Sequence, residues 1–296
     1  MQGAEFHSYW ISSGETEGGS GAYAEHFPYW SFTKTVITIC TLKLSEEGMV
    51  DLDAYLDGQP FTLRQLLSHT AGLPDYGALA DYHRDVAADE EPWPREKVLG
   101  AVLTRGGLFA PGQGWSYSNV GYMMAREQIE AASGLSFQRL VNDLVCRPLG
   151  LRSIELATTR DQFSQLYWNA AKHYHPGWVY HGCLTGSVRD AAGVLHGLFS
   201  GKLLSAGMLD QMLSRHPLGG AIAGRPWTDC GYALGLMSGT MGESGRAIGH
   251  SGVGPFSVNA VYHFADRDMP ITVACFTNGN EEGPVEFEAA RIAQRQ

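Results

Sequence analysis

The chain has 296 residues, of which 44% are hydrophobic, and it carries a formal net charge of −10. A chain of this length and apolar content can bury a large core, as one big domain or two closely packed ones. The acidic balance argues against a nucleic-acid footprint and against binding to an anionic membrane surface. No apolar run approaches the length that spans a bilayer. We therefore expect neither nucleic acid nor a membrane among its partners.

The start of the chain and its cysteines bear on the compartment. Residues 1–5 lack the basic segment and apolar stretch that mark an export signal, although a trimmed signal would look the same. The cysteines are odd in number and scattered, without paired spacing: Cys40, Cys146, Cys183, Cys230 and Cys275. This usage is typical of reduced, mostly buried thiols, so we expect a cytoplasmic protein.

The predicted elements begin with two strands and a long helix. Alternating residues predict strands over residues 5–12 and 22–27, with the glycine run 18–21 as a turn between them. Apolar residues then recur with helical spacing and predict a helix over residues 31–47, which Gly48 ends.

The middle of the chain is predicted to be mostly helical. Thr62 is a candidate N-cap for a short helix, and a polar loop is expected over residues 75–94. Further helices are predicted over residues 95–104, 119–132, 136–146, 187–199 and 205–214. The aromatic stretch 158–186 shows no clear period, and we assign no element to it.

From Gly231 onward the pattern changes to strands, which turn residues separate. They are predicted over residues 232–237, 247–251, 258–264 and 271–276. An amphipathic helix is predicted over residues 284–294. We therefore expect an α/β (α+β) fold that forms a single catalytic unit. In it the sheet part comprises about residues 1–48 and 205–296, and a mostly helical part, about 49–204, is inserted between them.

The first segment that points to chemistry runs from Ser31 to Lys34. Of the five lysines only Lys34 has a serine three positions before it, and residues three apart on a helix share one face. The amine can then take the hydroxyl proton while the oxygen attacks, provided that desolvation or a nearby cation lowers its pKa. Alone, the pattern is more typical of a capping serine and a surface lysine.

Two further segments follow in order, Tyr117-x-Asn119 before a predicted helix and His250-x-Gly252 on a predicted strand. Together with serine-x-x-lysine they resemble the serine β-lactamase and penicillin-binding-protein superfamily, in the branch of class C β-lactamases, DD-carboxypeptidases, D-aminopeptidases and related esterases. The same branch is matched by three other segments: 66–74, 109–122 and 148–151. The resemblance implies the β-lactamase-like fold, with the active site in the crevice between the sheet part and the helical part.

The resemblance also implies catalytic roles. Ser31 would be the acylated nucleophile and Lys34 its proton acceptor. Tyr117 would relay protons between Ser31, the deacylating water and the leaving group. Whether Lys34 or Tyr117 is the formal base stays open. The sequence implies no metal and no organic cofactor.

Four more matched positions would bind substrate. Asn119 would hold the substrate's carbonyl or amide side, and the N–H groups of Ser31 and Val253 would form the oxyanion hole. Gly252 would let the strand pass close to the substrate. His250 departs from the lysine that many members carry, where a cation meets a substrate carboxylate. Because histidine is mostly neutral at pH 7, this favours esters or amides without that carboxylate over an efficient β-lactamase.

Other signals are weaker. Residues 249–253 nearly match the nucleophile elbow of α/β-hydrolases, but the final glycine is missing and no strand-turn-helix follows. Three histidines, at 173, 175 and 181, lack carboxylate or thiolate neighbours, so pocket-lining or surface positions are favoured over a metal site. His69 is typical of a packed, hydrogen-bonded histidine. At least one of five aromatic residues is expected to touch ligand: Tyr167, Trp168, Tyr174, Trp178 or Tyr180.

We therefore expect a serine hydrolase that forms an acyl-enzyme on a small-molecule ester, amide or short peptide. An esterase or a D-amino-acid-type peptidase or amidase is favoured over a true β-lactamase. The alternatives are a protein that binds acyl or peptidoglycan-like ligands without turnover, and a weak β-lactamase or DD-carboxypeptidase. The short segment before the first strand would leave a sheet edge open or covered by a second subunit, as in a homodimer.

Overall fold

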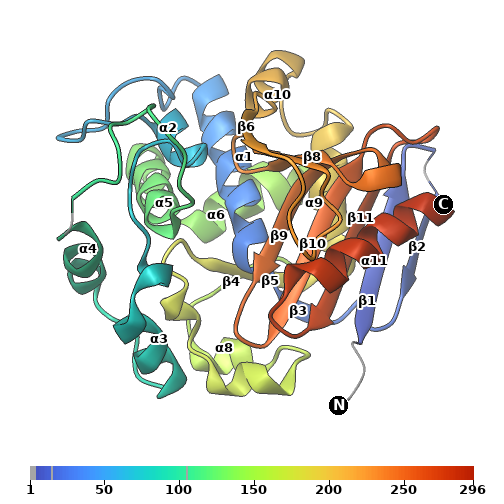
Figure 1. Cartoon of the computed structure of the whole chain (residues 1–296), viewed down its shortest axis with the longest axis horizontal. Helices are drawn as coiled ribbons and strands as arrows, with labels where there is room; N and C mark the ends of the chain where they lie inside the picture. The colour runs from blue at the N-terminus through green and yellow to red at the C-terminus, as the bar shows by residue number, and fades with distance from the viewer. Residues whose placement is uncertain (1–4, 15, 105) are drawn as a thin grey trace.

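The computed structural model describes residues 5–14, 16–104 and 106–296. Over these residues the main sheet has eight antiparallel strands in the order β2-β1-β11-β10-β9-β8-β7-β6. Their bounds are β1 (Phe6–Ser12), β2 (Glu17–Ser20), β6 (His216–Gly219), β7 (Asp229–Tyr232), β8 (Met237–Thr240), β9 (Arg246–Val253), β10 (Ser257–Phe264) and β11 (Ile271–Asn278). Figure 1 shows the blue strands β1 and β2 beside β11, so the sheet joins the beginning of the chain to its end.

Two helices cover opposite faces of this sheet, α9 (Val188–Phe199) and α11 (Glu282–Arg295). Successive residues of a strand point to opposite faces, so Ala274 of β11 joins the apolar cluster of α9 while Val273 joins that of α11. In Figure 1 α11 crosses the near face of the sheet. An antiparallel sheet flanked by helices confirms the predicted fold class.

The helix that carries Lys34 is α1 (Thr33–Glu46), which a short 3-10 turn, η1 (Trp30–Phe32), precedes. Every residue from Thr33 to Leu42 is buried, as expected of a helix enclosed on all sides. Its hydroxyls are satisfied inside the protein: Thr35 Oγ1, for example, donates to the Gly235 carbonyl at 2.7 Å. The predicted helix is therefore confirmed, with Ser31 in the turn just before it.

The helical part lies on the other side of α1. Its helices are α2 (Leu63–Leu67), α3 (Ala80–Ala87), α4 (Arg95–Leu103), α5 (Asn119–Ser133), α6 (Phe137–Val141), α7 (Arg147–Leu149) and α8 (Arg160–Ser164), and α10 (Ala206–Met212) follows α9. Thr62 caps α2 in a capping box with Gln65, as the sequence predicts. A small sheet, in the order β3-β5-β4, links this part to the segment before Ser31: β3 (His26–Pro28), β4 (Glu155–Ala157) and β5 (Cys183–Ser187).

The glycine run was predicted as a turn, and that prediction is wrong: residues 17–20 form the edge strand β2. A Cβ atom on Gly19 would lie 2.6 Å from the Tyr23 ring and 2.7 Å from the Tyr9 ring. Glycine is therefore what lets β2 approach β1 beneath these aromatic rings. Of the strand predicted over residues 22–27, only the last two residues belong to a strand, β3.

Three other segments also differ from prediction. The loop over residues 75–94 contains α3, whose short apolar stripe of Tyr82 and Val86 is only partly buried. The unassigned stretch 158–186 contains most of β5, whose residues are all buried and therefore do not alternate. Residues 233–236 turn between β7 and β8, where a strand was predicted, and Gly235 has a φ of +66° there.

No helix in the described part of the chain is long and apolar enough to cross a membrane.

Candidate active site

Three of the predicted site residues meet at the start of α1. The Ser31 hydroxyl oxygen lies 3.1 Å from Lys34 Nζ, within hydrogen-bond distance, and accepts a hydrogen bond from the Tyr117 hydroxyl at 2.8 Å. Tyr117 is 86 positions away along the chain and stands just before α5. A nucleophile, a candidate base and a candidate acid are therefore within hydrogen-bond distance of one another.

Lys34 is fully buried, and its environment lowers its proton affinity. Desolvation lowers the pKa of its amine to about 7, against the opposing charge of Asp75. Near neutral pH a substantial fraction of Lys34 is therefore the free amine, which can accept a proton. The amine also donates to Asn119 Oδ1 at 2.7 Å.

Tyr117 is held as a neutral phenol. Burial raises its pKa above the ordinary value, although the hydrogen bond to Ser31 opposes this. The His69 ring packs against it with 4.3 Å between the ring centroids, and His69 Nδ1 accepts the Ser118 N–H at 3.1 Å. His69 is thus packed and hydrogen-bonded, as the sequence predicts, and Tyr117 is suited to donate a proton.

Asn119 is fixed by a carboxylate that the sequence analysis missed. Asp75 accepts the Asn119 backbone N–H at 2.7 Å and its Nδ2 at 3.0 Å, so Asn119 Oδ1 points toward Lys34. An acidic residue in the predicted polar loop gives no periodic signal. The available clue was its place directly after the family-like segment 66–74.

His250 lies on β9 and is 2% exposed. Burial, and then the charge of Lys34, lowers its pKa to about 3, so the ring is neutral. Its Nδ1–H donates to the Ser251 carbonyl at 2.5 Å, which leaves Nε2 to accept from the Tyr232 hydroxyl at 3.0 Å. Both ring nitrogens are engaged, so His250 presents no cation to a substrate carboxylate.

Gly252 and Val253 end β9 beside the turn that holds Ser31. A Cβ atom on Gly252 would lie 2.6 Å from the Tyr29 carbonyl oxygen and 2.9 Å from the Asn259 amide group. The space that glycine leaves is thus taken by the backbone just before Ser31. The Val253 side chain is partly exposed and borders the site on its open side.

We expect Gly252→Ala to destabilise the fold by about 1–3 kcal/mol, because the added methyl group must displace backbone rather than a flexible side chain. Urea unfolding measures this change. The control is Gly100→Ala in α4, where a Cβ meets no atom within 4 Å and which we expect to stabilise by about 0.5–1 kcal/mol. If Gly252→Ala were as stable as the wild type, the contact between this position and the Tyr29 carbonyl would not be tight.

Two pockets meet at Ser31, and Asn119 and Val253 border both. One, the sheet-side pocket, has a volume of about 570 Å³ and is lined further by Trp115, Tyr117, Arg225, Tyr232, His250 and Glu282. The other, the helix-side pocket, has a volume of about 360 Å³ and is lined further by Tyr76, Tyr82, His83, Tyr174 and His181. An acyl group and a leaving group on either side of Ser31 would each have a space.

The comparison with family models agrees with this geometry. The Beta-lactamase family model matches residues 15–296 of the chain. The chain belongs to the Beta-lactamase family. The predicted resemblance to the serine β-lactamase and penicillin-binding-protein superfamily is thereby confirmed.

Curated relatives of this family member match it over part of their length. Penicillin-binding protein 4* of Bacillus subtilis (strain 168) is 31% identical over 167 residues, which cover 52% of this chain and 34% of that protein. A D-aminopeptidase of Cereibacter sphaeroides is 33% identical over 98 residues, which cover 33% of this chain and 19% of that protein. The chain thus spans about a third or less of these two relatives.

A solved structure shows the same fold over nearly the whole chain. The D-amino acid amidase of Ochrobactrum anthropi SV3, complexed with D-phenylalanine, superposes with a TM-score of 0.81 at 18% identity. The match covers 98% of this chain and 94% of the amidase.

The backbone before Ser31 is strained in this family member. Trp30 has a φ of +46°, a left-handed conformation that is uncommon for any residue other than glycine. Its indole N–H donates to Ser257 Oγ at 3.0 Å, and its ring packs edge-on against Tyr174 and Phe256. These contacts fix the residue next to the candidate nucleophile, and the sequence pattern gave no sign of them.

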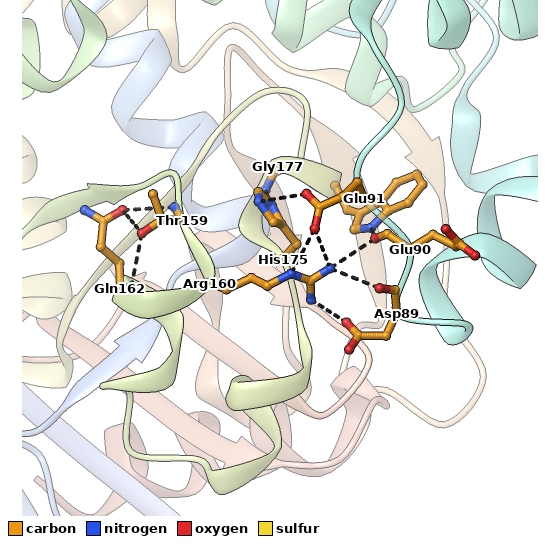
Figure 2. A network of polar contacts seen from close by, with 9 residues as sticks. Asp89, Glu90, Glu91, Thr159, Arg160, Gln162, His175 and Gly177 are labelled. Atoms are coloured by element: carbon orange, nitrogen blue, oxygen red, sulfur yellow. Dashed lines mark hydrogen bonds and ion pairs between the residues drawn. The ribbon is translucent and has the colours of Figure 1, made fainter.

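The wall of the helix-side pocket that α3 supplies is anchored by Arg160. Figure 2 shows this side chain, from α8, reaching between Asp89 and Glu91, which follow α3. Its guanidinium also donates to the carbonyls of Asp89 at 3.0 Å and Glu90 at 3.2 Å. His175 Nε2 lies 3.6 Å from the Glu91 carboxylate. Since several bonds converge on one planar group, they hold this segment better than one surface ion pair would.

The structure also places the residues of the weaker sequence signals. His173 is exposed, His175 faces Glu91, and only His181 reaches the site, where it lies beside Lys34. Over the described ranges no three His, Cys, Asp or Glu side chains form a group that could hold a metal ion. Ser251 of the elbow-like segment is buried on β9 and donates to Glu286 at 2.5 Å, so it is not presented as a nucleophile. Tyr174, one of the five aromatics, lines the helix-side pocket.

Proposed function

We propose that this chain is a serine hydrolase that forms an acyl-enzyme on Ser31, with an amide or an ester as substrate. The observation that carries the proposal is the position of the Ser31 hydroxyl. It lies 3.1 Å from the Lys34 amine and 2.8 Å from the Tyr117 hydroxyl, where the two pockets meet. A protein that only binds ligand has no need of a buried lysine in this place.

The reaction follows from the protonation states of the two neighbours. The free amine of Lys34 takes the hydroxyl proton as Ser31 Oγ attacks the substrate carbonyl, and the oxyanion faces the backbone N–H groups of Ser31 and Val253. The phenol of Tyr117 gives its proton to the leaving group, and the proton that Lys34 took from Ser31 then passes to the Tyr117 phenolate, because Ser31 Oγ now carries the acyl group. Water then attacks the acyl group, and the same proton steps in reverse restore Ser31.

The substrate class is supported by His250 and by the relatives. Because both nitrogens of His250 are occupied and its ring is neutral, substrates that need a cation for a carboxylate at this position are disfavoured. The relatives are named as a penicillin-binding protein, a D-aminopeptidase and a D-amino acid amidase. We therefore propose amides and short peptides of D-amino acids first, small esters second, and β-lactams last.

The charge of the sheet-side pocket supports a substrate with a free amino group. Arg225 is committed to the buried Glu286 by two bonds, at 2.5 and 2.7 Å, which leaves the carboxylate of Glu282 on the pocket wall 3.4 Å from Arg225. One cation between two carboxylates leaves a net negative charge. A substrate ammonium in this pocket would be attracted to it.

We expect Glu282→Gln to raise KM for D-phenylalanine amide about 3- to 10-fold and to leave KM for the uncharged p-nitrophenyl acetate unchanged, since a partly exposed charge contributes about 1 kcal/mol. Steady-state kinetics on both substrates measure the difference. Glu281→Gln is the matched control, because the Glu281 carboxylate is next to Glu282 in the sequence but is exposed and does not line the pocket. An equal change on both substrates would show that Glu282 does not sense the ammonium.

Initial rates on a chromogenic panel test the proposal: a short-chain p-nitrophenyl ester, a D-alanine p-nitroanilide and a chromogenic cephalosporin, each with wild type and Ser31→Ala. Turnover that vanishes in Ser31→Ala supports the hydrolase and identifies its substrate class. A single burst equivalent to the enzyme concentration, without a steady state, would instead support the ligand-binding alternative. Turnover that survives in Ser31→Ala would refute the mechanism.

A reducing compartment such as the cytoplasm is supported by the thiols. All five cysteines are buried, and none forms a disulfide. Such thiols are typical of proteins that fold where disulfides are kept reduced.

A further inference from the structure

Lys34 has a neighbour that belongs to none of the sequence motifs. His181 stands just before β5, is 2% exposed, and places Nε2 3.2 Å from Lys34 Nζ. Within the described structure its Nδ1 is buried and makes no hydrogen bond. It lines the helix-side pocket together with Ser31.

The hydrogen-bonding capacity of Lys34 indicates what this neighbour does. A neutral amine has two N–H donors and one lone pair, whereas an ammonium has three N–H donors. Three atoms surround Nζ: Ser31 Oγ at 3.1 Å, Asn119 Oδ1 at 2.7 Å and His181 Nε2 at 3.2 Å. Asn119 offers an acceptor here, because its Nδ2 is engaged with Asp75.

We propose that His181 is a positioning residue whose Nε2 accepts one N–H of Lys34, so that the lone pair of the neutral amine faces the Ser31 hydroxyl. Asn119 Oδ1 holds the second N–H. After the proton moves from Ser31 to Lys34, the ammonium has three donors and three acceptors, and none of its hydrogens is left unbonded. The inference rests on the proposed function of Ser31 and Lys34.

The surroundings keep His181 in the form that this role needs. Burial, and then the charge of Lys34, holds the pKa of His181 well below its ordinary value, so the ring stays neutral. A neutral ring can have its proton on either nitrogen, and the tautomer that this role requires has the proton on Nδ1 and leaves Nε2 to accept. The titratable and charged groups that face Lys34 and His181 come from several elements: Asp75, His69, Tyr117, Tyr122, Arg126, Cys183 and His250. Of these, the Asp75 carboxylate opposes the loss of the Lys34 proton most.

The test uses three variants that separate the contact from the volume and polarity of the side chain. His181→Leu fills the space without an acceptor. A glutamine amide reaches about as far as Nε2, so His181→Gln can supply an oxygen to Lys34. A shorter asparagine amide reaches only about as far as Nδ1, so His181→Asn is polar but lacks the contact. Tm confirms that each variant is folded.

The first readout is the pH profile of kcat/KM on the substrate that the panel identifies. Loss of an acceptor destabilises the ammonium, so the pKa of Lys34 falls and the rise of activity with pH moves to lower pH. We expect His181→Leu and His181→Asn to shift this rise downward by about 0.5–1 pH unit and to lower the plateau about 10- to 100-fold. His181→Gln should keep the wild-type position and stay within about 3-fold of the wild-type plateau.

The second readout needs no turnover and so separates this inference from the proposed function. With only five lysines in the chain, the ¹³Cε signals of labelled lysine are few, and Lys34→Met assigns the one of interest. The titration of this signal should move to lower pH in His181→Leu and His181→Asn but not in His181→Gln. If the wild type is inactive but these shifts are present, the proposed hydrolase function is refuted, whereas the proposed contact between His181 and Lys34 stands.

Two results would overturn the inference. A shift to higher pH in His181→Leu would show that Nε2 donates to the lone pair of Lys34, which blocks rather than directs it. An unchanged titration in all three variants, whatever their Tm, would show that His181 only fills space.

Discussion

Lys34→Met is expected to lower kcat/KM by about three orders of magnitude, the usual range for removal of a positioned general base. Methionine fills the buried space of the lysine stem, but it leaves Ser31 Oγ without the amine that lies 3.1 Å away. Tyr117 is a poor substitute, because burial raises its pKa above the ordinary value. Initial rates on the p-nitrophenyl ester measure the loss. Lys43→Met is the control, since Lys43 is on the same helix and its amine faces Glu46 at 3.9 Å.

The pH dependence of kcat/KM is a second measurement of the role of Lys34. Activity requires the neutral amine, and the pKa of Lys34 is about 7, so wild-type kcat/KM should rise with pH and reach half its plateau near pH 7. In Lys34→Met the rise with its midpoint near pH 7 should disappear. The residual kcat/KM should instead increase in proportion to the hydroxide concentration, without a plateau. A variant that keeps a tenth of wild-type activity together with the rise near pH 7 would assign the base to another group.

Tyr117→Phe is expected to lower kcat for an amide substrate about 10²- to 10³-fold. The change removes only the hydroxyl that donates to Ser31 Oγ at 2.8 Å and leaves the ring in contact with His69 and Trp115. We therefore expect a stability change within about 1 kcal/mol, the net contribution of one hydrogen bond. Parallel kinetics and thermal unfolding separate the two effects.

The choice of substrate tests the role of the phenol as a proton donor. An amine leaving group needs a proton, whereas p-nitrophenolate leaves without one, so Tyr117→Phe should impair the p-nitroanilide or amide at least about 10-fold more than the p-nitrophenyl ester. Tyr167→Phe, which removes an exposed hydroxyl bonded to Glu5, should leave both rates unchanged. Equal losses on amide and ester would instead indicate that Tyr117 acts in the attack of Ser31.

The core of the site was predictable because its signals are local in sequence. The spacing of Ser31 and Lys34 identified a shared helix face, and the segment at Tyr117 and Asn119 matched the same family in order. The structure brings all four together. The protonation states were not predictable, because the pKa values of Lys34 and Tyr117 depend on burial, which no local pattern reports.

The parts that sequence reasoning missed depend on contacts across the chain. Asp75 was not singled out, and His181 was predicted only as a pocket-lining or surface residue, because each acts through a partner in another element. Glu286 stands on the buried face of an otherwise well-predicted helix, where it accepts from Arg225 and Ser251. A buried polar group of this kind is defined by its partners rather than by its neighbours in sequence.

The same reason explains the errors in the fold. Two of the four residues of β2 are glycines, which only the aromatic rings above them explain, and the apolar residues of α3 are only partly buried. By contrast, the strands β10 and β11 and the helices α1, α5 and α11 carry strong local patterns, and they are found close to their predicted bounds.

The most direct test of the central claim is labelling with a fluorophosphonate, which loses fluoride to an activated serine and stays attached. Intact mass and peptide mapping should show one phosphonyl group per chain, on Ser31, formed faster as pH rises through 7 and about 10³-fold more slowly in Lys34→Met. Ser31→Ala should not be labelled. Equal labelling of Ser31→Ala, or a label on another residue such as Ser251, would contradict the assignment of Ser31 as the nucleophile.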